Sequence, residues 1–118
     1  MNTTECAKEQ FLRILTRSMR RQIPVNEIVY AENDLKKIIL HTTDETIVYE
    51  AAMRDLEEQL GDSFFRCHRG YLINLAHVKD HGADMILMDN DEEVYLSRRK
   101  AAQFEASLLA NDEKTTGS

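Results

Sequence analysis

Apolar residues recur along the chain in short runs, and small clusters of Asn, Asp and Thr separate these runs. Their β-rich composition predicts strands at residues 10–19, 22–25, 28–31, 35–41, 46–49, 71–75, 85–88 and 94–96. Polar residues at 32–34 predict a turn, and those at 42–45 and 89–91 predict the tips of two hairpins. The pattern therefore favours a mainly β fold with antiparallel sheets.

Two stretches change to a helical period. Within residues 51–60 three apolar side chains fall on one helical face, Met53, Leu56 and Leu60. Gly61 follows as a stop signal. Ser97 is suited to cap a second helix, whose apolar face would hold Ala101, Phe104 and Leu108. The sequence thus predicts one internal helix and one short C-terminal helix.

The length of 118 residues indicates a single domain. We expect a flexible lead at 1–9, the domain at 10–110 and a disordered polar tail at 111–118. The start of the chain has no signal-peptide pattern, and no apolar run approaches the roughly 20 residues of a membrane span. Two cysteines make no disulfide framework and fit a reducing compartment. The prediction is a cytoplasmic protein without membrane insertion.

The formal net charge of −6, from 15 basic and 21 acidic residues, argues at first against a polyanionic partner. The charges are, however, segregated. Residues 10–26 hold four arginines and no acid, whereas residues 80–93 hold six acids and no Lys or Arg. Further cations fall at 64–79 and 98–100. Basic segments that converge in space would form an electrostatic footprint for phosphate, and scattered ones would be ordinary solvated faces.

The most informative stretch is 64–75, Phe-Phe-Arg-Cys-His-Arg-Gly-Tyr-Leu-Ile-Asn-Leu. About twenty residues later comes 94–100, Val-Tyr-Leu-Ser-Arg-Arg-Lys, and upstream lies 26–32, Asn-Glu-Ile-Val-Tyr-Ala-Glu. In order and spacing these segments resemble the LytTR-type DNA-binding domain of bacterial transcription regulators, the LytR, AlgR and AgrA kind. The resemblance covers roughly residues 10–109.

This resemblance implies a mostly antiparallel β fold that presents loops, rather than a recognition helix, to double-stranded DNA. It also implies binding to direct repeats in promoters, as a homodimer on DNA, with no enzymatic activity, cofactor or metal. Three places would contact DNA: the loop near residues 33–37, the segment around the motif His, and the loop before the last helix. The residues that match them are Lys36, Lys37, Arg66, His68, Arg69, Arg98 and Arg99. Arginine suits the task because its planar fork can hold guanine or phosphate with two bonds.

Two features depart from the family pattern. Gly70 stands where a small hydroxyl residue is common, so one phosphate hydrogen bond would be missing. Most members also carry a receiver or membrane module before this domain, where this chain has residues 1–9, so we expect a stand-alone regulator or an excised fragment. The alternative function is a protein-interaction module, held by a regulatory partner such as a membrane-bound inhibitor.

Cys67 and His68 allow other chemical interpretations. Neighbours on a strand point to opposite faces, so the two cannot pair as nucleophile and base. We favour a small core thiol at Cys67 and a His68 that orders its loop by hydrogen bonding. The alternatives are a redox-sensing cysteine among arginines and a zinc site with His77 and His81, for which a Cys-x-x-Cys pair is lacking.

Overall fold

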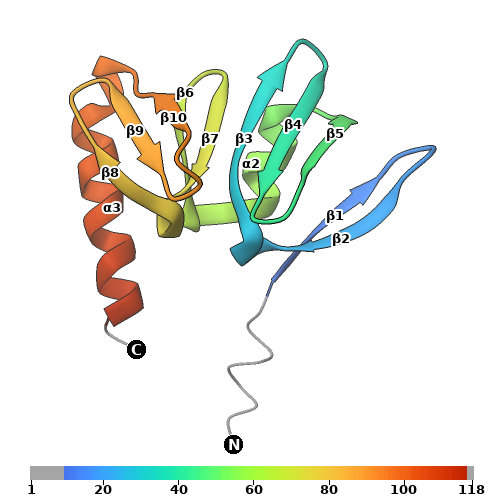
Figure 1. The fold of residues 1–118 in the computed structure, drawn as a ribbon, viewed down its shortest axis with the longest axis horizontal. Coiled ribbons are helices and arrows are strands. Elements are labelled where there is room, and N and C mark those ends of the chain that lie inside the picture. The colour runs from blue at the N-terminus through green and yellow to red at the C-terminus, as the bar shows by residue number, and fades with distance from the viewer. Residues whose placement is uncertain (1–9, 117–118) are drawn as a thin grey trace, which may run out of the picture.

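Between residues 10 and 116 the fold consists of short strands in three sheets with two α-helices (Figure 1). The computed structural model describes the backbone of residues 10–116 and the side chains of residues 10–111. The strands are β1 (Phe11–Leu15), β2 (Arg20–Pro24), β3 (Ile28–Asp34), β4 (Lys37–Thr42), β5 (Thr46–Glu50), β6 (Phe64–His68), β7 (Tyr71–Asn74), β8 (Val78–His81), β9 (Met85–Met88) and β10 (Glu93–Tyr95). The helices are α2 (Met53–Leu60) and α3 (Ala101–Thr116), with 3₁₀ turns η1 (Val25–Glu27), η2 (Gly61–Ser63), η3 (Leu75–His77) and η4 (Arg98–Lys100).

All strand pairs are antiparallel, as predicted. The central five-stranded sheet has the order β5-β4-β3-β7-β6. A two-stranded ribbon, β1-β2, and a three-stranded sheet, β10-β9-β8, complete the fold. The hairpins expected around residues 42–45 and 89–91 are present as β4-β5 and β9-β10. The mainly β fold class is therefore confirmed.

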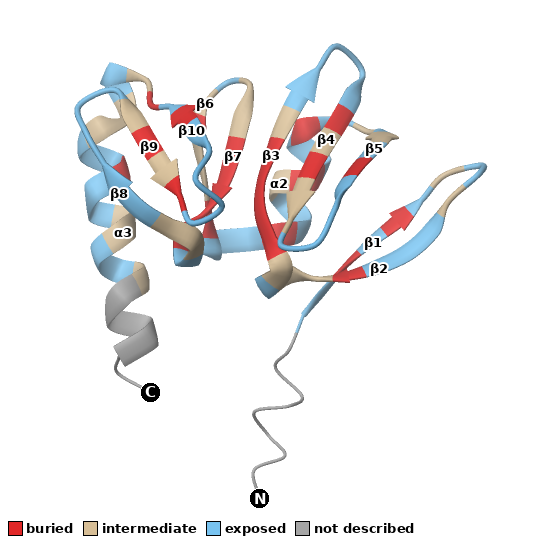
Figure 2. Cartoon of the chain, viewed as in Figure 1, coloured by how far each residue is buried: buried red, intermediate tan, exposed pale blue. Residues whose placement is uncertain are grey.

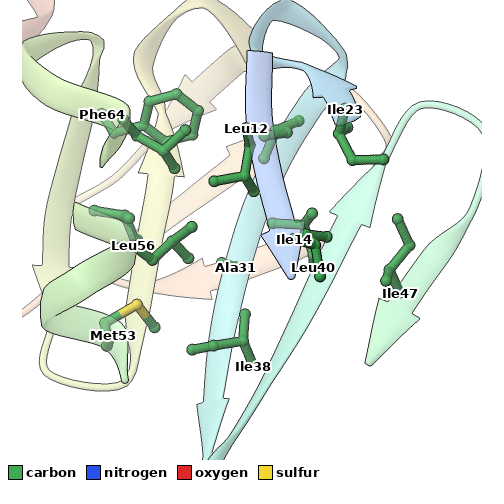
Figure 3. Packing of buried hydrophobic residues seen from close by; sticks show 13 residues of the cluster. Leu12, Ile14, Ile23, Ala31, Ile38, Leu40, Ile47, Met53, Leu56 and Phe64 are labelled. Carbon is green, nitrogen blue, oxygen red and sulfur yellow. The ribbon is translucent and has the colours of Figure 1, made fainter. Parts of the chain in front are cut away.

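The first hydrophobic core lies between the central sheet, helix α2 and the β1-β2 ribbon (Figure 3). The helical residues at i, i+3 and i+7 are all buried there, which explains why residues 53–60 form an amphipathic helix. From the ribbon, Leu12, Ile14 and Ile23 point into the same cluster. Gly61 ends the helix with φ +76°, a conformation that glycine adopts without steric cost.

A second core joins the central sheet to the three-stranded sheet and α3. Phe104 of α3 is completely buried, and its ring packs at 5.8 Å from that of Phe65 and edge-on to His81 at 5.1 Å. Because successive side chains of a strand point to opposite faces, Ile86, Met88 and Val94 of the three-stranded sheet point into this core. The two cores hold the three sheets in fixed positions, so their loops are carried on a rigid scaffold.

Four local expectations are corrected. Residues 32–34 are not a turn: β3 continues to Asp34, because Asp34 still pairs with Lys37 of β4, and the turn falls at 35–36. The first strand ends at Leu15 rather than continuing to residue 19. Helix α3 extends to Thr116, six residues into the expected disordered tail, in a stretch without Gly or Pro. The Ser97 side chain makes no capping hydrogen bond. The expected lead at 1–9 and residues 117–118 lie outside the described residues.

No helix in the described part of the chain is long and apolar enough to cross a membrane.

Candidate nucleic-acid interface

Three loops that are distant in sequence lie along one edge of the molecule, the upper edge in Figure 1: the β3-β4 turn, the β6-β7 turn and the segment between β10 and α3. Backbone hydrogen bonds join them. The Asn33 N–H donates to the Gly70 carbonyl at 2.9 Å, which ties the first loop to the second. The Ser97 N–H donates to the Cys67 carbonyl at 2.8 Å, which ties the third loop to β6. The three predicted contact regions therefore lie along one edge and are linked to one another through β6 and β7.

The β3-β4 turn carries Leu35, Lys36 and Lys37 at an exposed tip (Figure 2). Leu35 has φ +58°, which is strained for a residue with a Cβ, and its side chain is 91% exposed. Neither lysine forms an ion pair with an acid in the described part of the chain. The tip thus presents two cations that form no ion pair, beside an apolar side chain, although Asp34 and Glu50 are the register partners of Lys37.

The β6-β7 turn is held by Arg66. Its Nε and Nη2 both donate to the Arg69 carbonyl, at 3.2 and 2.6 Å, and its Nη1 donates to a carboxylate oxygen of Glu57 at 3.1 Å. Arg66 is thereby committed to contacts inside the protein. Arg69, whose backbone it fixes, projects an exposed guanidinium that has no ion pair among residues 10–111. Of the two arginines, Arg69 is the one free to contact a ligand.

His68 orders the same turn. Its Nδ1 accepts the Gly70 N–H at 3.1 Å, so the neutral ring carries its proton on Nε2. The half-buried ring lies 5.9 Å from that of Tyr71 and 6.4 Å from that of Tyr95. These contacts agree with the expectation that His68 orders its loop. They leave one N–H donor at Nε2.

The third loop contains η4, with Arg98 and Arg99 exposed and without ion pairs in the part of the chain that the structure describes. The next residue, Lys100, turns inward, and its Nζ donates to the Arg66 carbonyl at 2.7 Å. This bond fixes the start of α3 against β6. Of these three consecutive cations, Arg98 and Arg99 therefore point to solvent, whereas Lys100 binds the backbone of β6.

Cys67 lies in the second core and is completely buried. Burial raises the pKa of its thiol to about 12, although the positive charge of Lys100 opposes the shift. A thiol with such a pKa is neutral and inaccessible, which contradicts the redox-sensor and nucleophile alternatives. Within residues 10–111, no group of three His, Cys, Asp or Glu side chains could hold a metal ion.

No motif in the sequence indicated Arg54 as a contact residue. This residue of α2 lines an open groove of about 650 Å³ together with Lys36 and Arg66. The helical period held the relevant signal, because it turns Arg54 outward between the buried Met53 and Leu56.

Known proteins match the chain over most of its length. The model of the LytTr DNA-binding domain family matches residues 18–109. Transcriptional regulatory protein YpdB of Escherichia coli K12 is 33% identical over 88 residues, covering 69% of this chain and 36% of YpdB. An uncharacterized response regulatory protein of Vibrio cholerae is 25% identical over 91 residues, covering 73% and 38%. The chain thus spans little more than a third of either relative.

A solved structure agrees with these matches. The LytTr DNA-binding domain of a putative methyl-accepting/DNA response regulator from Bacillus cereus superposes with a TM-score of 0.69 and 27% sequence identity. The match covers 85% of this chain and 97% of the Bacillus cereus chain, so it includes nearly the whole of that domain. The family model, the relatives and the fold agree with one another: this chain belongs to the LytTR DNA-binding domain family.

Proposed function

We propose that this protein recognises specific duplex DNA in promoters through the three joined loops and thereby regulates transcription. The observation that carries the proposal is the set of hydrogen bonds that places three loops on one edge, with cations free of ion pairs on each. The proposed contact residues are Lys36, Lys37, Arg54, Arg69, Arg98 and Arg99. Arg66 and His68 act as positioning residues, since their polar atoms hold the β6-β7 turn.

The loops have the chemistry that this task requires. Arginine side chains at a rigid edge can hold guanine O6 and N7 or a phosphate with two parallel bonds, whereas lysines act as point charges on phosphate. Each phosphate contact releases counterions, so affinity should fall steeply with salt. The net charge of −6 opposes non-specific binding, and discrimination therefore rests on a few placed cations and on DNA shape.

The family and the similarity to a named transcriptional regulatory protein support a regulatory role. We further propose that two copies bind a direct repeat, and that the protein acts in the cytoplasm. An input module or a partner protein would control access to the promoter. Such a partner would have to leave the loop edge free when the protein binds DNA.

Selection from a pool of random duplexes tests the proposal and does not require the promoter to be identified first. Wild-type protein should enrich one motif, present twice in the same orientation. Arg69→Ala protein should fail to enrich it at the same concentration. As a matched control, Lys79→Ala removes a cation from the exposed Lys79–Asp91 pair, away from the three loops, and should enrich the wild-type motif. A wild-type selection with no motif, or the same motif with Arg69→Ala, would contradict the assignment.

A further inference from the structure

The β1-β2 ribbon has an outward face that the three loops do not include. Because Leu12, Ile14 and Ile23 are buried, the opposite face consists of the cross-strand pairs between them. These pairs are Phe11 with Pro24, Arg13 with Gln22, and Leu15 with Arg20. Phe11 is 49% and Leu15 69% exposed. The face thus combines two large apolar side chains with two arginines.

The outward face of this ribbon carries positive charge that has no acidic partner among the described residues. Residues 10–26 contain no acid, and Arg13, Arg17 and Arg20 form no ion pair with any described residue. Arg21 differs, since it lies on the other face and pairs with Glu45 at the β4-β5 turn. An apolar face bordered by free cations is typical of a surface that binds a partner of opposite charge.

The three-stranded sheet has an outward face of complementary chemistry. Its inner side is buried through Ile86, Met88 and Val94. On the outer side the register places Asp80, Leu87 and Glu93 in one row across β8, β9 and β10. Met85 and Tyr95 form the neighbouring pair, and Tyr95 is 60% exposed. Neither Asp80 nor Glu93 has an ion pair within the described residues.

The two faces belong to opposite ends of the molecule. In Figure 1 the ribbon lies at one end of the longest axis, which extends 45 Å, and the three-stranded sheet lies at the other. They cannot contact each other within one copy. From this charge and apolar complementarity, we propose that the β1-β2 ribbon of one copy binds the outer face of β8-β9-β10 of a second copy.

Such a contact joins two different surfaces, so it is head-to-tail and repeats in one direction. Adjacent copies would then follow one another head to tail, as the half-sites of a direct repeat do. The cations of the loop edge belong to neither face, although Tyr95 of the acidic face lies 6.4 Å from His68 of the β6-β7 turn. The interface does not depend on DNA, although its use on a promoter rests on the proposed function. Its small faces and solvated charges make the association weak and sensitive to salt.

Sedimentation equilibrium without DNA tests the proposal. At low salt the average mass of the wild type should rise with protein concentration, and 0.5 M salt should suppress the rise. Arg13→Glu/Arg20→Glu and Asp80→Lys/Glu93→Lys should each weaken self-association by roughly 10- to 100-fold, since two attractive pairs become repulsive. An equimolar mixture of these two variants should associate again, because each supplies the charge that the other requires.

Control variants with the same change in net charge are Arg98→Glu/Arg99→Glu and Glu58→Lys/Asp62→Lys, which should sediment as the wild type does. Circular dichroism verifies that every variant is folded. A wild type that stays monomeric at low salt, or a mixture that fails to associate, would overturn the inference and leave the DNA-binding proposal intact. Loss of single-site DNA affinity in Arg13→Glu/Arg20→Glu, with sedimentation unchanged, would instead make the ribbon a DNA contact and also overturn it.

Discussion

Asn74 ends β7 and is 3% exposed, with every polar atom of its side chain engaged. Its Nδ2 donates to the Ile28 carbonyl at 2.9 Å and to the Val25 carbonyl at 3.4 Å. Its Oδ1 accepts the Ala76 N–H at 3.0 Å and so caps η3. The side chain therefore joins three segments beneath the loop edge, and we expect Asn74→Ala to destabilise the fold without removing a DNA contact.

The size of the loss follows from these bonds. Leaving the buried Ile28 carbonyl without this donor costs about 1–3 kcal/mol. Loss of the cap on η3 adds about 1 kcal/mol. The longer bond to Val25 adds little, so the expected loss is about 2–4 kcal/mol. A small domain has a total stability of only about 5–15 kcal/mol, and this change is a large part of it.

Urea denaturation measures the effect. With a slope of about 1–3 kcal/mol/M and a loss of about 2–4 kcal/mol, the denaturation midpoint of Asn74→Ala should fall by about 0.7–4 M. Asn26→Ala is the matched control: Asn26 is exposed, and its loss should change stability by less than about 0.5 kcal/mol. Well below its melting temperature, Asn74→Ala should keep the wild-type salt dependence of DNA binding. A stability loss below about 0.5 kcal/mol would refute the reasoning.

Three further predictions concern the loops and the core. Leu35→Gly relieves a positive φ and loses no packing, because Leu35 is exposed. Its free energy of unfolding in urea should rise by about 0.5–1 kcal/mol. A lower free energy of unfolding would contradict backbone strain at this position. Gly70→Ser should fold normally, because its Cβ would meet only His68 Nδ1 at 3.6 Å, and its hydroxyl should raise DNA affinity by about two- to fivefold in anisotropy titrations. In a Cys6→Ser background, native Cys67 should resist iodoacetamide at pH 8 and react in urea. Fast labelling of the native protein would contradict the burial of Cys67. The folded pKa of the Cys67 thiol, about 12, exceeds the ordinary value of 9.0. The stability that this thiol contributes is therefore complete below pH 9 and is lost as the pH rises toward 12.

The sequence predicted most elements because their signals are local. Strand alternation, the period of Met53, Leu56 and Leu60, and polar hairpin tips all report on neighbouring residues. The errors arose where pairing outweighs composition. Polar residues at 32–34 indicated a turn, yet β4 pairs with them to the end. The end of α3 likewise had no breaker to mark it, and polar composition alone suggested disorder.

The candidate site was predictable as a set of loops but not as a set of roles. Arg66 and Arg69 are alike in sequence, and only the three-dimensional fold shows that the former holds the carbonyl of the latter. Lys100 follows two exposed arginines, yet it anchors β6. Arg54 of α2 lines the same groove as Lys36 of the β3-β4 turn, and no spacing in the sequence encodes this proximity. Long-range packing decides which cation faces the ligand.

The proposed function requires that cations on the three loops bind DNA. The most direct test is fluorescence anisotropy on the duplex that the selection enriches, at several salt concentrations. Arg69→Ala and Arg99→Ala should each cost about 1–3 kcal/mol, roughly 5- to 150-fold in affinity, and should lessen the salt dependence where the lost contact is to phosphate. Lys79→Ala, away from the three loops, should bind like the wild type. Folded Arg69→Ala and Arg99→Ala proteins with wild-type affinity would contradict the account.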